Sequence, residues 1–251
     1  MRTATSLRNE TSVDEENPYW MSFSDIMAGL LVIFILAAVA LILELDQKSK
    51  RWDEEIDKFA EAEKVRKDVL NDIQRELYAR GIKVIISEND TVIRIPEDVF
   101  KFEPTKFNIP SDPVKQNIAM QIGEVLYAAI KKGDRWKYLD TIFVEGHTDN
   151  RPYNNEAIKG NWGLSTFRAI SVWNFWNSSA DGGEKLEALE NHQGNKLFSV
   201  SGYADTRPVP KTAEDMDDEI AYNSKNRRID IRFTIRRPEM KDYDKTKAGL
   251  R

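Results

Sequence analysis

The hydrophobic positions of the chain fall into three successive patterns. Residues 26–43 carry no charged side chain, and a helix of that length is about enough to cross ~30 Å of hydrocarbon. Over residues 46–80 apolar positions recur every three or four residues among many charges, as in an amphipathic helix. From Gly81 onward, short apolar runs alternate with turn residues. The patterns predict a transmembrane helix over 19–45, a linker helix over 46–80 and a separate domain over 81–237.

The apolar segment has two alternative interpretations. A buried core helix is usually shorter than this run, and a cleaved signal peptide begins with a positively charged region. Ala38-Val39-Ala40 resembles a cleavage site, but residues 1–18 contain two arginines and four carboxylates, and the apolar run continues to Leu43. We therefore expect a retained single span that begins with the interface aromatics Tyr19 and Trp20.

The apolar stripe of residues 46–80 has nothing nearby in the sequence against which it can be buried. Pairing with a second copy, packing on the following domain and a fully solvated charged connector all fit the pattern. Gly81 is a typical position for the helix to stop. The stripe consists of Trp52, Ile56, Phe59, Ala62, Val65, Val69, Ile73 and Leu77.

The C-terminal domain is predicted to combine strands with helices. IKVIIS and TVIRI, separated by END, predict a β-hairpin. Three helices are predicted by SDPVKQNIAMQIGEVLYAAIKKG, with a cap at Ser111, by LSTFRAISVWNFWN and by GGEKLEALENHQG. Three further strands are predicted by LDTIFVEGH, KLFSVSGY and NRRIDIRFTIR. The order β-β-α-β-α-(α)-β-β gives an α+β domain with its own core, followed by a charged tail over 238–251 that we expect to be frayed.

Composition narrows the classes of protein to consider. The chain has 37 Lys and Arg against 42 Asp and Glu, for a net charge of −5. A mildly acidic chain without a dense basic block gives no electrostatic reason to expect a nucleic-acid partner. Cysteine is absent, which excludes disulfides, thiolate metal sites and a lipidated cysteine anchor.

The most informative motif residues lie in the middle of the domain. A predicted strand ends in GHTD, NWGLSTFRA opens the next helix, and NRR precedes the last strand. Asp149 at the end of a strand and Arg168 one turn inside a helix can project into the same cleft. A carboxylate there would bind an ammonium group and a guanidinium would clamp a carboxylate, which together suit a zwitterionic amino-acid centre. An ion pair that joins strand to helix is the purely structural alternative.

These blocks, in this order, resemble the OmpA-like peptidoglycan-binding domains over residues 81–237. The resemblance implies that Asp149 and Arg168 bind the meso-diaminopimelate of the peptidoglycan stem peptide. It also implies that four other residues line or close that pocket, namely Thr148, Asn161, Leu164 and Arg228.

A catalytic or metal site is not expected. Glu145, His147 and Asp149 alternate along the predicted strand, a spacing that would place three ligands on one face. However, the chain holds only one other histidine, His192, and no serine lies in a nucleophile pattern with a base. We expect His147 to be a hydrogen-bonded structural residue, and we expect the domain to bind its ligand without catalysis, metal or cofactor.

Asp25 stands at the beginning of the apolar segment, in the stretch WMSFSDIMAG. A carboxylate deep in a lipid-facing helix costs about 2.5–3.5 kcal/mol unless it is protonated or faces protein. Ser22, Ala28, Gly29 and Val32 share its helical face and are mostly small, which suits close packing against partner helices. A simple cap of the first helical turn is the alternative.

The stretch around Asp25 resembles the B subunits of ion-driven stators, and its SDIMAGLL wording most resembles the branch that acts in anti-phage defence. The resemblance implies that Asp25 carries H⁺ as the coupling ion. It also implies a multi-span A-type channel subunit, as a pentamer around a dimer of this chain, in the lipid of the bacterial inner membrane. Segment 1–18 would be cytoplasmic and the domain periplasmic, although the lysines and arginines beside the span favour the reverse orientation. A flagellar motor subunit and a passive tether from membrane to wall are the alternatives.

Overall fold

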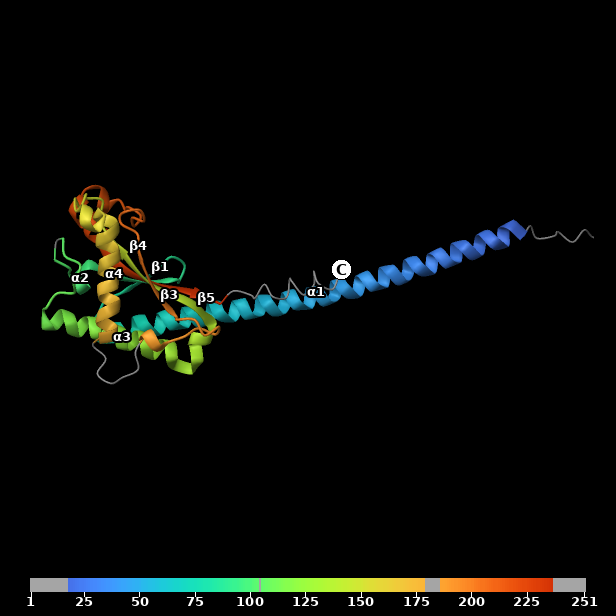
Figure 1. Ribbon diagram of the computed structural model, residues 1–251, viewed down its shortest axis with the longest axis horizontal. Helices are drawn as coiled ribbons and strands as arrows, with labels where there is room; N and C mark the ends of the chain where they lie inside the picture. The colour runs from blue at the N-terminus through green and yellow to red at the C-terminus, as the bar shows by residue number, and fades with distance from the viewer. Residues whose placement is uncertain (1–17, 104, 179–185, 237–251) are drawn as a thin grey trace, which may run out of the picture. The chain divides into compact units, whose positions relative to one another are not determined.

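The computed structural model describes residues 18–103, 105–178 and 186–236 (Figure 1). The chain divides into two compact units, Met1–Glu55 and Ile56–Arg251. Apart from Pro18, the predicted N-terminal segment lies outside the described residues, as does the predicted tail over 238–251.

A single helix, α1 (Pro18–Ala79), takes the place of the two helices predicted over 19–45 and 46–80. No glycine or proline interrupts the sequence between Leu30 and Ala79, so nothing local breaks the hydrogen-bond ladder. The helix ends before Gly81, whose φ of +76° lies in the left-handed region, and this confirms the predicted stop. Among the described residues, α1 is the one helix long and apolar enough to cross a membrane.

The second unit is built on a five-stranded sheet in the order β1-β2-β5-β3-β4. The β3–β4 pair is parallel, and the other three pairs are antiparallel. The strands are β1 (Ile85–Ser87), β2 (Val92–Pro96), β3 (Leu139–His147), β4 (Phe198–Gly202) and β5 (Arg228–Ile235). The remaining α-helices are α2 (Glu97–Phe100), α3 (Pro113–Lys131), α4 (Gly160–Ser178) and α5 (Glu219–Asn226). Short 3₁₀ turns lie at Lys132–Tyr138, Glu156–Ile158, Leu186–Ala188 and Glu214–Met216.

Most of the predicted elements are confirmed. The hairpin of β1 and β2 closes through Glu88, Asn89 and Asp90, all with positive φ. Asp112 rather than Ser111 caps α3, because its side chain accepts a hydrogen bond from the Val114 amide at 2.9 Å.

Two further corrections concern segments between the predicted strands. Of the extra helix predicted after Gly182, the described part forms the 3₁₀ turn Leu186–Ala188 and an isolated bridge between Glu190 and Lys196. Helix α5 was not predicted. It has only eight residues, and its Ile220 is 83% exposed, so it lacks the apolar stripe that marks a longer helix.

The last turns of α1 belong to the core of the second unit. Val69, Leu70, Ile73 and Leu77 are fully buried in one cluster with residues of the sheet, α3 and α4. Beside them, Asp72 bonds Lys132 and Arg135 after α3, and the Lys132 hydrogen bond lowers the pKa of Asp72 to about 2. Of the three interpretations of the stripe, packing on the following domain is therefore the correct one for residues 62–77, whereas Trp52, Ile56 and Phe59 are exposed.

We expect Leu70→Ala to lower the free energy of unfolding by about 2–5 kcal/mol, because it removes a fully buried side chain. The measurement is urea unfolding of the whole chain in detergent, followed by near-UV circular dichroism. Ile56→Ala is the matched control on the same helix, since Ile56 is 60% exposed. Equal losses in the two variants would contradict a structural role for this part of α1.

Helix α4 packs unusually closely on β3 and β4. A Cβ atom at Gly146 would lie 1.9 Å from the Ser165 carbonyl oxygen, and one at Gly202 would lie 2.0 Å from Thr166 Oγ1. Only glycine fits at either position, so the backbone of each strand lies directly against Ser165 and Thr166 of the helix. This contact brings the start of α4 to the end of β3, where the motif residues lie.

Candidate functional site

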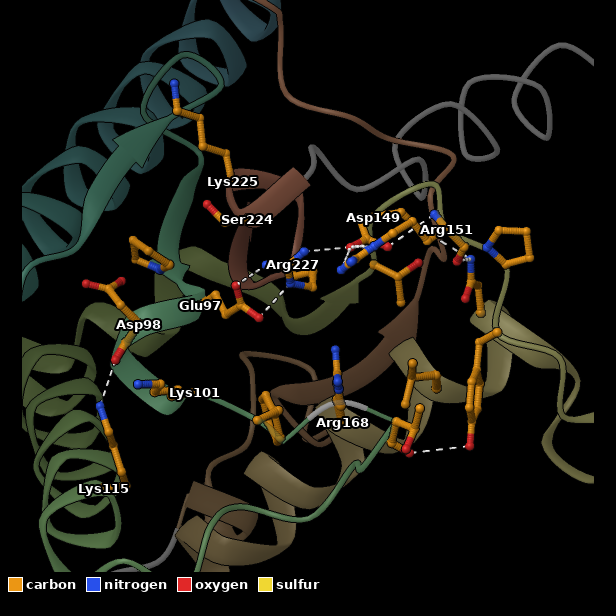
Figure 2. A pocket seen from close by; sticks show the side chains of 18 residues that line it. Glu97, Asp98, Lys101, Lys115, Asp149, Arg151, Arg168, Ser224, Lys225 and Arg227 are labelled. Atoms are coloured by element: carbon orange, nitrogen blue, oxygen red, sulfur yellow. Dashed lines mark hydrogen bonds and ion pairs between the residues drawn. The ribbon is translucent and has the colours of Figure 1, made fainter. Parts of the chain in front are cut away.

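A pocket of about 810 Å³ lies where the end of β3 meets α2, the start of α4 and the end of α5 (Figure 2). Its walls carry twice as many cationic as anionic side chains, so the pocket favours an anionic ligand or one with several carboxylates. The cations are Lys101, Lys115, Arg151, Arg168, Lys225 and Arg227, and the carboxylates are Glu97, Asp98 and Asp149.

Asp149 lies two residues beyond the end of β3 and is 5% exposed. Its Oδ2 accepts hydrogen bonds from Arg151 Nε (2.9 Å), Arg151 Nη2 (2.6 Å) and Arg227 Nη1 (2.6 Å). Burial by itself would raise the pKa of Asp149, but the bonds from Arg151 and Arg227 outweigh it and hold that pKa below its ordinary value. Asp149 is therefore a carboxylate at neutral pH.

Arg227 lies between two carboxylates, as Figure 2 shows. It makes a bidentate pair with Glu97 of α2 through two bonds of 2.6 Å, while Nη1 reaches Asp149. The pair with Glu97, together with Asp149, raises the pKa of the guanidinium further above its usual range despite partial burial. This chain of charges connects α2 to the end of β3.

Arg168 projects into the same pocket from α4 and makes no ion pair with Asp149, so the strand-to-helix staple considered from the sequence is not formed. Its Nε donates to the Lys106 carbonyl at 3.0 Å, its Nη2 donates to the Glu103 carbonyl at 3.4 Å, and the guanidinium lies 5.1 Å from the centre of the Phe102 ring. Burial lowers the pKa of Arg168, and Glu97 opposes that shift; an arginine remains charged at neutral pH. Within the described residues, Nη1 has no hydrogen-bond partner.

Three other residues expected in the site do line this pocket. The Asn161 side-chain amide donates to the Arg151 carbonyl at 3.0 Å and so ties down the loop after Asp149. Leu164 contributes an apolar wall and is 6% exposed. Thr148 is buried, and its hydroxyl has no partner among the described residues.

Arg228 does not line this pocket, contrary to the sequence-based prediction. As the first residue of β5 its side chain points to the outer face of the sheet, where Nε bonds Asp230 at 2.9 Å and Nη2 bonds the Arg207 carbonyl at 2.9 Å. Its neighbour Arg227, the C-cap of α5, occupies the pocket instead.

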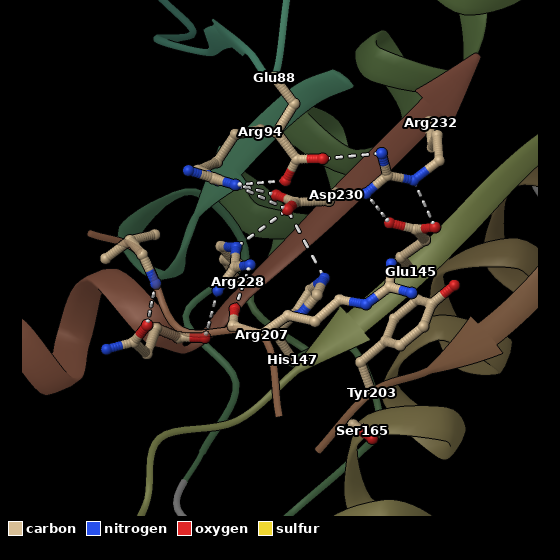
Figure 3. Close-up of polar contacts among 12 residues, drawn as sticks. Glu88, Arg94, Glu145, His147, Ser165, Tyr203, Arg207, Arg228, Asp230 and Arg232 are labelled. Carbon is tan, nitrogen blue, oxygen red and sulfur yellow. Dashed lines mark hydrogen bonds and ion pairs between the residues drawn. The ribbon is translucent and has the colours of Figure 1, made fainter. Parts of the chain in front are cut away.

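The outer face of the sheet carries a buried ion network (Figure 3). Asp230 is fully buried and accepts bonds from Arg94 at 3.1 and 3.0 Å and from Arg228 at 2.9 Å. Burial raises the pKa of Asp230, but Arg94 and Arg228 outweigh it, so the net shift is downward. Next to this group, Arg232 holds the buried Glu145 through bonds of 2.8 and 3.0 Å. The network joins β2, β5 and β3 across the face away from the helices.

His147 differs from the expectation of a hydrogen-bonded residue. Its ring stacks on Tyr203 with the centroids 5.4 Å apart, and its Nε2 lies 3.5 Å from Asp230 Oδ2 (Figure 3), but neither nitrogen has a hydrogen-bond partner in the described parts of the chain. Burial and the nearby Arg228 lower the pKa of His147 to about 3, so the ring is neutral. Glu145 and His147 face the ion network while Asp149, beyond the end of β3, faces the pocket, so the alternation that suggested three ligands on one face is broken.

Sequence reasoning missed Arg151, Arg227 and Glu97, the three residues that bond Asp149 or each other. Arg227 belongs to the NRR motif and Arg151 lies two residues after the GHTD motif, so the motifs themselves could have identified both residues. Glu97 carries no local signal, because its place at the pocket depends on β2 pairing with β5. Asp25 lies on α1 in the other unit and is exposed in the structure.

One family of known proteins matches the second unit of the chain. Residues 102–215 match the family model described as "OmpA family". The chain is therefore a protein with a long apolar N-terminal helix followed by an OmpA-like mixed α/β domain.

The chain is similar to several individual proteins. Motility protein B of Bacillus subtilis (strain 168) is 28% identical over 68% of this chain and 55% of its own length. The uncharacterized protein YtxE of the same organism is 26% identical over 84% of this chain and 86% of its own length. Zorya protein ZorB of Escherichia coli O139:H28 (strain E24377A / ETEC) is 24% identical over 58% of this chain and 57% of its own length. The matches thus span little more than half of Motility protein B and of ZorB.

Proposed function

We propose that this chain is the B-type, stator-like subunit of an ion-driven motor in the bacterial inner membrane, and that its OmpA-like domain anchors the motor to peptidoglycan. The observation that carries the proposal is the pocket, which brings Asp149 and Arg168 together with Thr148, Asn161 and Leu164 among an excess of cations. No catalytic step is part of the proposal, because the site's chemistry is charge recognition.

The ligand proposed for the pocket is the meso-diaminopimelate of a stem peptide. The free Nη1 of Arg168 would bind a carboxylate of the ligand, since a planar guanidinium matches that group. Asp149 would bind the ammonium group of the same amino-acid centre. The cationic excess on the walls supports a ligand that carries more carboxylates than ammonium groups.

The membrane part of the proposal rests on α1 and Asp25. One helix cannot enclose a path for ions, so a multi-span A-type subunit would surround it, with five copies around two copies of this chain. Asp25 would take up and release a proton, driven by about 2.3 kcal/mol per charge per 100 mV of membrane potential. The N-terminus would be cytoplasmic and the OmpA-like domain periplasmic, where peptidoglycan lies.

The system served by this motor is proposed to be anti-phage defence. Similarity to Zorya protein ZorB and the SDIMAGLL wording around Asp25 support this assignment. Similarity to Motility protein B supports a flagellar motor as the second candidate. A passive tether without ion flux is the third, since it would need the same binding domain.

We expect Arg168→Ala to weaken binding of a diaminopimelate-containing muropeptide by at least about 30-fold, because losing one side of a desolvated charge pair costs about 2 kcal/mol or more. The measurement is isothermal titration of the whole chain in detergent. Unchanged affinity would overturn the proposed ligand site.

Arg168→Lys provides the matched control for this measurement. Lysine keeps the positive charge but lacks the planar guanidinium that matches a carboxylate, so we expect an affinity between those of the unaltered chain and Arg168→Ala. Near-UV circular dichroism of each variant separates lost binding from lost structure, because Arg168 also holds the carbonyls of Glu103 and Lys106.

A further inference from the structure

The carboxylate proposed to bind the ligand's ammonium is already occupied by the chain's own guanidinium groups. Asp149 receives three side-chain bonds, two from Arg151 and one from Arg227, and its Oδ1 also accepts the Arg151 backbone amide at 3.2 Å. Two guanidinium groups therefore already occupy the oxygen of this carboxylate to which an ammonium group of a ligand would bind.

The two arginines are held very differently. Arg227 has a 20% exposed side chain and a bidentate pair with Glu97, so it remains fixed even without Asp149. The Arg151 side chain is 67% exposed, and its three guanidinium nitrogens bond nothing but Asp149 within the described residues. Its backbone, in contrast, is tied to Asn161 through the 3.0 Å bond to its carbonyl. The side chain of Arg151 can therefore swing away while the loop stays in place.

We propose that Arg151 is a built-in competitor whose guanidinium occupies, on Asp149, the place of the ligand's ammonium group, and that binding exchanges one cation for the other. The inference rests on the proposed peptidoglycan site and adds a residue that sets its affinity. An exposed ion pair contributes little net free energy, so Arg151 can be displaced at modest cost. It also keeps the buried carboxylate of Asp149 paired when no ligand is present.

The exchange affects only ligands that bring their own ammonium. A ligand with carboxylates alone could bind Arg168 but would leave Arg151 on Asp149. A ligand with a free ammonium gains the carboxylate of Asp149 and frees the Arg151 guanidinium for solvent or for another carboxylate of the ligand. The cost of displacing Arg151 lowers the affinity for every ligand with a free ammonium group. It does not change the affinity for a ligand with carboxylates alone.

The test is to titrate the whole chain in detergent with a diaminopimelate muropeptide and with the same muropeptide acetylated at its side-chain amine. We expect Arg151→Ala to tighten binding of the free-amine ligand about two- to fivefold and to leave the affinity for the acetylated ligand unchanged. Lys101→Ala is the matched control, because it removes one positive charge from the same pocket without a bond to Asp149. We expect it to give no gain with either ligand.

The outcomes separate this inference from the proposed function. If the unaltered chain binds the free-amine ligand and Arg151→Ala binds it equally or more weakly, the competitor role is wrong and the site stands. An equal gain with Lys101→Ala, or an equal gain with the acetylated ligand, would also overturn it, since both indicate a general charge effect. If neither the unaltered chain nor Arg151→Ala binds the free-amine ligand, the proposed function fails and the inference fails with it.

Discussion

Asp25→Asn is expected to abolish the activity of the proposed motor while the protein still accumulates in the membrane. Asparagine has nearly the size of aspartate and can still cap a helical turn, but it cannot take up and release a proton. The substitution therefore removes the proposed proton transfer at this position and keeps the size and the capping ability of the side chain. The measurement is phage protection and swimming in cells that carry the intact system, with membrane abundance determined in parallel.

The phenotype that disappears identifies the system, since loss of protection points to defence and loss of swimming to motility. Asp46→Asn is the matched control, because Asp46 lies on the same helix beyond the apolar segment and pairs with Lys50 at 2.8 Å; we expect it to keep full activity. Survival of activity in Asp25→Asn, together with its loss in Asp149→Ala, would make the chain a passive tether to the wall.

Asp230→Ala is expected to destabilise the OmpA-like domain by about 3–5 kcal/mol, because removing one partner of a buried ion pair leaves its counter-charges unpaired. Here the unpaired groups are Arg94, 15% exposed, and Arg228, 2% exposed. Urea unfolding of the whole chain in detergent measures the loss. Glu124→Ala is the control, since Glu124 is an exposed carboxylate of α3 paired with Arg80 at 3.3 Å and its removal should change the midpoint little.

The same carboxylate gives the unaltered domain a defined acid sensitivity. Since the folded pKa of Asp230 is lowered, its contribution to stability is fully present above its unfolded pKa of ~3.9 and is lost as the pH falls through the folded pKa. We expect the stability difference between the unaltered chain and Asp230→Ala to shrink below about pH 4. A difference that stays constant over that range, or a variant as stable as the unaltered chain at pH 7, would contradict the assigned role of the network.

The sequence predicts the elements of the fold where the pattern depends only on residues that are neighbours in the chain. Alternation in LDTIFVEGH and in NRRIDIRFTIR, the turn residues END and the stop at Gly81 each depend on neighbouring residues, and the structure has an element or a boundary at each. Helix α5 escaped prediction because it is short and presents Ile220 to solvent. The pattern also does not predict that α1 is continuous, because the change from apolar to charged composition near residue 45 divides it into two segments with different hydrophobic periodicity.

The sequence predicts some residues of the candidate site but not how they are paired. The motifs located Asp149 and Arg168, but the pairing of Asp149 depends on which side chains the sheet order brings beside it, and Glu97 arrives there only through β2 and α2. The NRR motif contains both Arg227 and Arg228, and the prediction named Arg228, whereas Arg227 is the one that lines the pocket. Successive side chains at the start of a strand point to opposite faces, and the motif alone does not say which of the two faces the pocket.

The close contact of Gly146 and Gly202 with α4 has a consequence for how the site can evolve. Asp149 lies beyond the strand on one side of that contact, and Arg168 belongs to the helix on the other side. The distance between the anionic and the cationic anchor therefore depends on two absent methyl groups. A methyl group added at Gly146 or Gly202 would push the helix away from the sheet and so change the length of molecule that fits between the anchors.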